Sequence, residues 1–259
     1  MSGKLRIQTV AERADLDPGK TEAPLAAAWP PFVLAAPAAE RYWDRVLGDF
    51  AAWQLLAFDD AGELVAAGHS APFHWTGRPA DLPDGWDAVL AQAVDDLDAG
   101  RPPTALAALS VTVRESHRGR GLSREVLGAL RAAALAGGLE DLVAPVRPAD
   151  KHRYPLIPME QYLTWTRPNG RPFDPWLGVH LDLGAEVVGV CPASMVVTAP
   201  VAQWERWTGL PLPGSGRYVV PGALVPVEVD VDRDEGRYQE PNVWVRHRLS
   251  GQGRVATTA

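Results

Sequence analysis

The stretch Ala105–Leu135, ALAALSVTVRESHRGRGLSREVLGALRAAAL, decides the fold that the rest of the chain must accommodate. It starts with an almost unbroken apolar run that ends in Val111-Thr112-Val113, a pattern typical of a strand buried on both faces. Its second half ends before Gly137-Gly138 and carries apolar residues at helical spacing, namely Leu122, Val126, Leu127, Leu130 and Ala134. The stretch therefore predicts a central strand, a tight basic loop and an amphipathic helix.

The loop between them reads Arg118-Gly119-Arg120-Gly121-Leu122-Ser123. Its two glycines let the backbone turn sharply, so that successive N–H groups can point at one place at the helix N-terminus. Unpaired amides, the helix dipole and the two arginines together favour an anion such as phosphate or pyrophosphate. The loop lacks the endings of the two common nucleotide-binding loops. Considered alone, it also allows a solvated turn after an ordinary strand.

The pattern Arg118-x-x-Gly121-x-Ser123 resembles the pyrophosphate-binding loop of the GCN5-related N-acetyltransferases, which reads Arg/Gln-x-x-Gly-x-Gly/Ala. Ser123 departs from that pattern, since a small hydroxyl residue replaces glycine or alanine. The resemblance implies an α/β fold with a mixed, mostly antiparallel central sheet flanked by helices, and acetyl-CoA or another acyl-CoA as co-substrate. It implies that the residues binding this co-substrate are Val111, Val113, Arg118, Gly119, Arg120, Gly121, Leu122 and Ser123, with a backbone N–H near Val111 to Val113 polarising the thioester carbonyl.

Composition restricts the other classes of protein. With 259 residues, 46% of them hydrophobic and 22% charged, the chain has the composition of a globular protein that can bury a full core. It has no apolar run of about 18 residues and no signal-like N-terminus, which predicts a cytoplasmic protein without a membrane partner. The net charge of −7 argues against nucleic acid. One cysteine, Cys191, excludes an intramolecular disulfide, and no His/Asp/Glu spacing suggests a metal site.

The first hundred residues predict a strand, helices and a hairpin before the central strand. The expected elements are an edge strand over 4–10, two helices between 23 and 49 broken at Pro30-Pro31 and Pro37, hairpin strands over 52–58 and 64–73, and a helix within 79–98. In the resembled family, the segment 23–49 would form a lid over the acceptor site.

After the stretch 105–135, a short strand over 140–146 is expected, and in the resembled fold it splays from the central strand so that the pantetheine arm passes between them. Residues 148–175 are too long for a plain connection, so they are either an insertion that shapes the acceptor pocket or an aromatic-rich surface elaboration. Beyond a helix that starts at Asp174-Pro175, the chain predicts an extended C-terminal β part over 186–259, with strands over 186–190, 194–198, 224–231 and around 243–245, and a helix over 201–207. The whole chain, 1–259, is treated as one domain.

Acetyl transfer to an amine needs a neutral amine, a site for the carbonyl oxygen and a proton for the thiolate. His180 is the expected proton donor, because it lies where the resembled family often has a tyrosine; a hydrogen-bonded core histidine is the alternative. Glu160 and, close by in sequence, His152 are the candidate bases, and Tyr162 and Trp165 are expected to bind the acceptor.

Two function classes stay open at this point. The first is an acyl-CoA-dependent N-acetyltransferase that acts on the amine of a small molecule by direct attack in a ternary complex. The second is a non-catalytic or regulatory CoA-binding module of the same fold, which would use its C-terminal sheet to form a homodimer. The sequence identifies neither the acceptor nor the oligomeric state.

Overall fold

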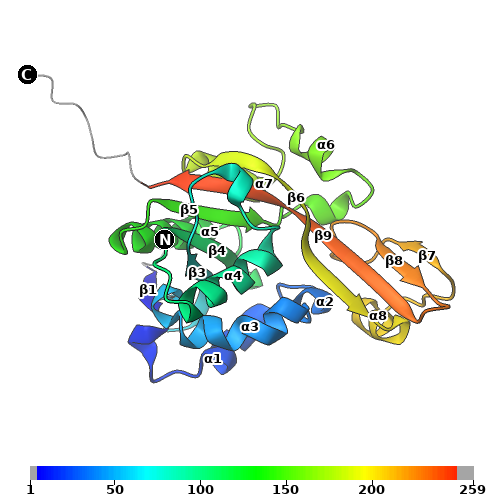
Figure 1. The fold of residues 1–259 in the computed structure, drawn as a ribbon, viewed down its shortest axis with the longest axis horizontal. Coiled ribbons are helices and arrows are strands. Elements are labelled where there is room, and N and C mark those ends of the chain that lie inside the picture. Colours follow the sequence, from blue (N-terminus) through cyan, green and yellow to red (C-terminus); the bar gives the residue numbers. More distant parts are fainter. Residues whose placement is uncertain (1–4, 250–259) are drawn as a thin grey trace, which may run out of the picture.

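A nine-stranded sheet forms the centre of the computed structural model, which describes residues 5–249 (Figure 1). Its strands are β1 Arg6–Thr9, β2 Leu55–Phe58, β3 Leu64–Phe73, β4 Ala105–Val113, β5 Asp141–Val146, β6 Glu186–Ala199, β7 Gly216–Tyr218, β8 Val227–Asp230 and β9 Glu235–Arg248. They run in the order β1-β2-β3-β4-β5-β9-β8-β7, and β6 pairs with β9. Only β4 and β5 pair in parallel among the strands described. The predicted mixed, mostly antiparallel fold class is confirmed.

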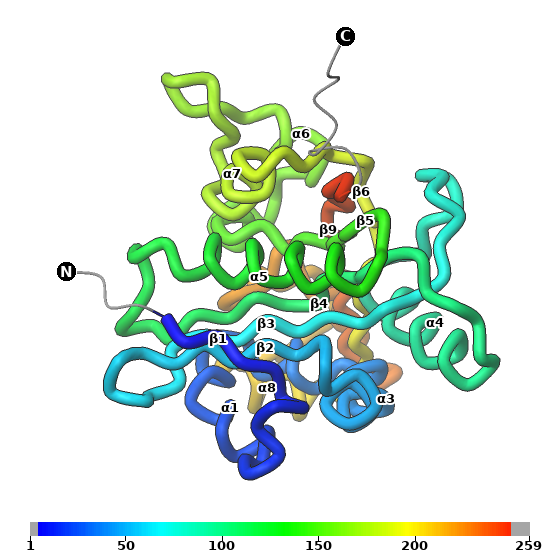
Figure 2. Tube along the Cα trace, turned by 90° about the vertical axis from the view of Figure 1, so that its left-hand side faces the viewer, coloured from blue at the N-terminus to red at the C-terminus, as the bar shows by residue number. Residues whose placement is uncertain are grey.

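Eight α-helices occur in the described part of the chain, several of them beginning at proline, which suits the first helical turn. They are α1 Pro18–Ala26, α2 Pro31–Leu34, α3 Pro37–Gly48, α4 Trp86–Asp98, α5 Leu122–Ala136, α6 Met159–Leu163, α7 Pro175–Asp182 and α8 Val201–Thr208. Helix α5 lies on one face of the sheet, with α1 and α3 on the other (Figure 2). The segment predicted as two helices holds the end of α1 and two further helices, because Pro31 and Pro37 each start one.

The central strand and its helix lie where the sequence predicts them. Residues Ala105–Leu109 of β4 are buried between β3 and β5. The five apolar residues that define the helical face of α5 are all buried. Close packing of α5 on the sheet depends on Gly68 in β3, where a Cβ would lie 2.6 Å from Cγ1 of Val126. Burial of these apolar faces is the main force that holds helix and sheet together.

Strand β9 carries the extended C-terminal part. One of its edges pairs with β6, and the other pairs first with β8 and then with β5. Its far end, with β7, β8 and α8, projects as an arm (Figure 1). Trp204 and Tyr238 fill the arm and contact Phe32 of α2 at ring-centroid distances of 5.4 and 5.2 Å. The two strands predicted over 186–190 and 194–198 are one strand, β6, with an irregular register between Cys191 and Met195.

Several sequence predictions concern features that the fold does not test. Lys4 and residues 250–259, which belong to the predicted edge strand and C-terminal part, lie outside the described residues. Within 5–249, no helix has the length and apolar character needed to span a membrane. The single-domain division, the cytoplasmic location and a homodimer stay predictions.

Candidate functional site

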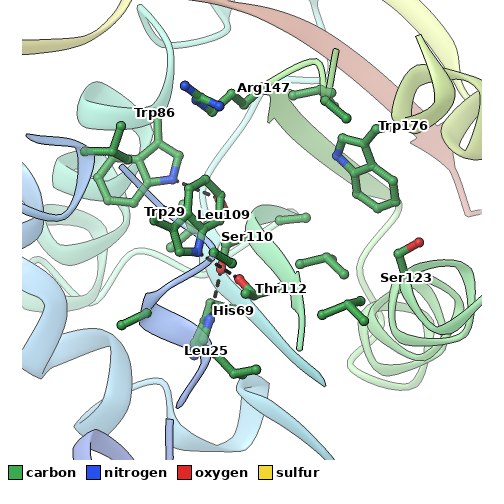
Figure 3. A pocket seen from close by; sticks show the side chains of 18 of the residues that line it. Leu25, Trp29, His69, Trp86, Leu109, Ser110, Thr112, Ser123, Arg147 and Trp176 are labelled. Atoms are coloured by element: carbon green, nitrogen blue, oxygen red, sulfur yellow. Dashed lines mark hydrogen bonds between the residues drawn. The ribbon is translucent and has the colours of Figure 1, made fainter. Parts of the chain in front are cut away.

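A cavity of about 1120 Å³ opens where β4 and β5 diverge. The two strands pair only from Ala105 to Ala107, although β4 continues to Val113. Just beyond this pairing, the β3–β4 register shifts, so that Leu109 has no partner residue in β3. The carbonyl of Leu109 instead accepts a hydrogen bond of 2.9 Å from the Trp86 indole (Figure 3). A β-bulge thus fixes the point at which the strands separate.

One end of the cavity, here the loop end, is formed by the basic glycine loop. Gly119 and Gly121 have φ angles of +76° and +82°, a left-handed conformation in which only glycine is free of strain. No side chain caps the N-terminus of α5, so its first amides are left for an anion. Seven of the eight residues expected to bind the co-substrate line the cavity: Val111, Val113, Arg118, Gly119, Gly121, Leu122 and Ser123.

Arg120 is the exception among the expected cofactor-binding residues. Its side chain is exposed, and its Nη2 donates to the carbonyl of Ser116 at 3.3 Å, outside the residues that line the cavity. Arg118 is therefore the loop arginine whose charge reaches the cavity wall. The other features of the loop end, namely free amides, two left-handed glycines and one arginine, fit a pyrophosphate.

His180 lines the cavity but is engaged in the core. It is 1% exposed, packs edge-on against Trp176 and contacts Nε2 of His247 through its Nδ1 at 2.9 Å. Burial, followed by His247, lowers the pKa of His180 to about 3, so the imidazole is neutral at physiological pH. A ring without an ionisable proton near neutrality is a poor general acid. The geometry favours the core role that the sequence left open.

The residues expected to provide the base and the acceptor pocket lie elsewhere. Glu160 is exposed on α6, and neither it nor Tyr162 or Trp165 lines the cavity. Tyr162 is 1% exposed and donates to Asp174 at 2.9 Å, while its ring packs with those of Tyr154, Trp165 and Phe173. These three residues therefore lie apart from the cavity, and the aromatic side chains of the insertion pack on one another. Only the ends of the insertion reach the cavity, among them Asp150 and His152.

A second part of the cavity, here the acidic end, is built by the N-terminal helices. Glu22 of α1 and both Glu40 and Asp44 of α3 line it. Glu40 and Asp44 are exposed, stand one helical turn apart and have no ion-pair partner within residues 5–249. Like charges at this spacing destabilise a helix slightly. Their arrangement is therefore suited to a cation from outside the chain.

Trp29, between α1 and α2, joins this helical segment to the sheet. Its indole donates to Oγ1 of Thr112 in β4 at 3.0 Å (Figure 3). Trp43 of α3 packs on His69, with 4.9 Å between ring centroids. The segment predicted as a lid thus contacts the strands directly, and it supplies the acidic end with two indole rings.

Arg147, just after β5, is a fixed cation in the wall of the cavity. Its Nε donates to both carboxylate oxygens of Glu240, at 3.0 and 2.9 Å, and its Nη2 to the carbonyl of Gly222 at 2.5 Å. Burial opposes the charge but Glu240 outweighs it, so the pKa of Arg147 is raised. Among the described residues, Nη1 has no hydrogen-bond partner, and the side chain lines the cavity.

His69 of β3 belongs to a chain of polar groups in the cavity wall. Its Nδ1 is 2.9 Å from Oγ of Ser110, and its Nε2 is 2.8 Å from Oε2 of Glu22. The sequence itself does not single out His69 as a site residue. A signal was present, since the pair His69-Ser70 interrupts the otherwise apolar run of β3. Glu22 and Arg147 carried no such signal, because each comes from a segment without a motif.

No protein-family model matches the chain. An arginine N-acetyltransferase of Aspergillus versicolor is 36% identical over 276 residues, which cover 94% of this chain and 93% of that protein. Among solved structures, the loading GNATL domain of CurA from Lyngbya majuscula has a TM-score of 0.59 at 15% identity, covering 95% of this chain and 97% of that one. The GphF GNAT-like decarboxylase in complex with isobutyryl-CoA has a TM-score of 0.56 at 21% identity, covering 95% and 99%. These two structures share the fold.

Proposed function

The chain belongs to the GCN5-related N-acetyltransferases and transfers an acetyl group from acyl-CoA to the amine of a small molecule; we propose that this amine is the α-amino group of arginine or of a close guanidino amino acid. The observation that carries the proposal is that one cavity contains both a fixed arginine, Arg147, and the carboxylates of the acidic end. The 36% identical relative is named for the same acceptor.

The chemistry of arginine selects its α-amino group. A guanidinium stays protonated at any pH at which proteins fold, so its nitrogens are not nucleophiles. The α-amine loses its proton near or moderately above neutrality and then has a lone pair for attack on a thioester carbonyl. Acetylation at the α-nitrogen follows from this difference alone.

Arg147 is suited to the α-carboxylate of the acceptor. Glu240 and the Gly222 carbonyl hold its Nε and Nη2, so the direction of its free Nη1 is fixed before the substrate arrives. Charge-assisted hydrogen bonds of this kind contribute about 1.5–3 kcal/mol. A carboxylate bound here would orient the adjacent α-amine within the cavity.

The acidic end is suited to the guanidinium of the acceptor. Glu40 and Asp44 line the exposed part of the cavity and lack ion-pair partners among the described residues. A guanidinium near two carboxylates would relieve their mutual repulsion. Arg147 and the acidic end together would select an amino acid with a cationic side chain over a simple amine.

The loop end would hold acetyl-CoA. We assign the pyrophosphate to the free amides of α5, with Arg118 alongside, and the thioester carbonyl to a backbone N–H near Val111 to Val113. Acetyl-CoA would supply the acyl group and leave as the free thiol. Because the two ends belong to one cavity, the amine can reach the thioester in a ternary complex.

An amine panel tests the acceptor. The purified protein is incubated with acetyl-CoA and arginine, agmatine, citrulline or lysine, and release of free thiol is measured. Agmatine lacks the carboxylate, and citrulline lacks the positive charge. The kcat/KM for each should be about 10- to 100-fold lower than for arginine, as expected for losing one charged contact. Fragmentation mass spectrometry should find the acetyl group on the α-nitrogen.

A variant of the acidic end, compared with a control variant outside the cavity, tests the role of these carboxylates. Asp44→Asn should raise the KM for arginine and leave that for citrulline near the parent value. Asp95→Asn removes an exposed carboxylate from α4, outside the cavity, and serves as the control. Equal kcat/KM values for arginine, agmatine and citrulline would overturn the assignment, as would acetylation of the guanidino group.

A further inference from the structure

Three polar side chains from separate parts of the chain meet in the wall of the cavity. They are Glu22 on α1, His69 on β3 and Ser110 on β4. Oγ of Ser110 is 2.9 Å from Nδ1 of His69, and Nε2 of the same ring is 2.8 Å from a carboxylate oxygen of Glu22. Hydroxyl, imidazole and carboxylate thus form a continuous chain that starts at the cavity surface.

The surroundings hold the histidine in this orientation. His69 is 3% exposed, and the indole of Trp43 packs on its ring. Its backbone position is fixed by pairing with Ser110 directly at the β-bulge. Figure 3 shows the imidazole directed at Ser110, next to Leu109, where β4 leaves β5. Ser110 itself is only partly buried and lines the cavity.

These three groups lower the stability of the folded state, which a purely structural role would not explain. The other carboxylate oxygen of Glu22 is buried without a hydrogen-bond partner, and the contact between Nε2 of His69 and Glu22 is short without being an aligned hydrogen bond. Buried polar atoms that lack partners destabilise the folded state. Such a cost is typical of groups kept for chemistry.

We propose that Ser110, His69 and Glu22 form a proton relay that deprotonates the attacking amine. As the nitrogen bonds to the thioester carbon, one N–H proton passes to Oγ of Ser110 while the hydroxyl proton of Ser110 passes to Nδ1 of His69. The carboxylate of Glu22 stabilises the imidazolium formed. The C–S bond then breaks and the electron pair leaves with sulfur. The thiolate takes up the proton held by His69, returned through Oγ of Ser110, so that amide and free thiol are the products and the relay is neutral again.

The position of Ser110 favours a relay over a nucleophile. The serine lines the same cavity as the glycine loop and the acidic residues, so both substrates can reach it together. A direct attack by the amine then needs no covalent intermediate, but it does need an acceptor for the amine proton at this place. The relay rests only on acetyl transfer to an amine, and not on the identity of that amine.

Single-turnover kinetics test the relay, with arginine or whichever amine of the panel reacts fastest. Ser110→Ala should lower the acetyl-transfer rate by about 10- to 100-fold, and His69→Gln by about 10² to 10⁴, the range of general base catalysis. Glu22→Gln should lower it by about 10-fold. The affinity for acetyl-CoA and the melting temperature of Ser110→Ala should match the parent. His74→Gln is the control, because His74 follows the same strand, is exposed and does not line the cavity.

A solvent isotope effect separates the relay from a structural role. Two protons move together in the parent, so its rate in H₂O/D₂O mixtures should vary non-linearly with the deuterium fraction. Ser110→Ala should show a smaller isotope effect with a linear dependence, because one moving proton is lost. If His69→Gln fails to fold, Ser110→Ala decides, since it removes a single hydroxyl.

Two results would overturn the relay. A parent-like rate and isotope effect in Ser110→Ala would show that the hydroxyl carries no proton. An acetyl group found on Ser110 by mass spectrometry, after incubation with acetyl-CoA alone, would make the serine a nucleophile. If arginine is inert but another amine gives the expected losses, the relay stands and the proposed acceptor fails.

Discussion

Two replacements of Gly121 test the loop end of the cavity. Of the alanine and aspartate variants, the aspartate variant should be the more stable but should bind CoA less tightly. Gly121 immediately precedes α5 with a φ of +82°, and a Cβ built there meets no atom within 4 Å. Gly121→Ala therefore introduces backbone strain without a clash. The left-handed conformation costs an L-residue about 1–2 kcal/mol. In a protein of this size, that cost lowers the melting temperature by about 2–8 °C.

Gly121→Asp adds a carboxylate at the same place. Aspartate accepts the left-handed conformation better than alanine, and a negative charge beside the free amides of α5 stabilises the helix by about 0.5–1 kcal/mol. The aspartate variant should therefore be the more stable of the two. It should also bind CoA less tightly, since a carboxylate about 5 Å from a phosphate charge repels it by about 2–3 kcal/mol at an effective dielectric constant of 20–40. This repulsion corresponds to about a 30- to 150-fold higher Kd.

Calorimetric titration with CoA and thermal unfolding provide the two readouts. Gly138→Ala is the matched control, because Gly138 follows the other end of α5 with a φ of +75° and also has open space around its Cβ. It should lose similar stability and keep the parent affinity for CoA. The affinity lost in Gly121→Asp should shrink at high salt, because the loop is exposed. Parent-like CoA binding by Gly121→Asp would refute the assignment of the pyrophosphate to this loop.

Two further substitutions test buried polar groups. His180→Ala removes the partner of His247, so we expect a stability loss of about 2–4 kcal/mol with turnover per folded molecule within about threefold of the parent; a 10²-fold lower kcat at unchanged melting temperature would instead make His180 the proton donor. Burial raises the pKa of Asp87 to about 6, above its unfolded value, so Asp87 stabilises the fold less as pH rises through that range. At pH 7.5, Asp87→Asn should therefore raise the free energy of unfolding by about 2 kcal/mol after solvent screening, and with it the melting temperature. Below about pH 4 the melting temperature should be unchanged. A gain independent of pH would contradict this reasoning.

The loop end could be predicted from the sequence because all its parts are local. Strand β4, the glycine loop and α5 follow one another without interruption, and each has its own pattern: an apolar run, two glycines that permit positive φ, and helical spacing. The register of neighbouring strands is not needed to bring these parts together. The same holds for α7, whose start follows from an Asp-Pro pair and whose cap is formed by Asp174.

The acidic end could not be predicted in this way. Glu22, His69 and Arg147 are far apart in sequence and are brought together only by the packing of α1 and the order of the strands. The aromatic insertion gave the stronger sequence signal, yet its rings pack on one another, and buried Lys151 donates to the carbonyls of Tyr154 and Leu224. Composition alone does not distinguish aromatic residues that bind a ligand from those that stabilise a loop.

The two ends of the cavity depend on one irregularity in β4. The bulge at Leu109 ends the pairing with β5, which opens the path between the strands, and it also sets Ser110 opposite His69. A bulge shifts which residues face each side, and a strand with alternating polar residues would reveal that shift in its pattern. Because the first five residues of β4 are all buried, the strand has no such alternation. Ser110 does interrupt the apolar run of β4, but the pattern does not show which side of the sheet it faces, although the strand itself is the clearest element of the sequence.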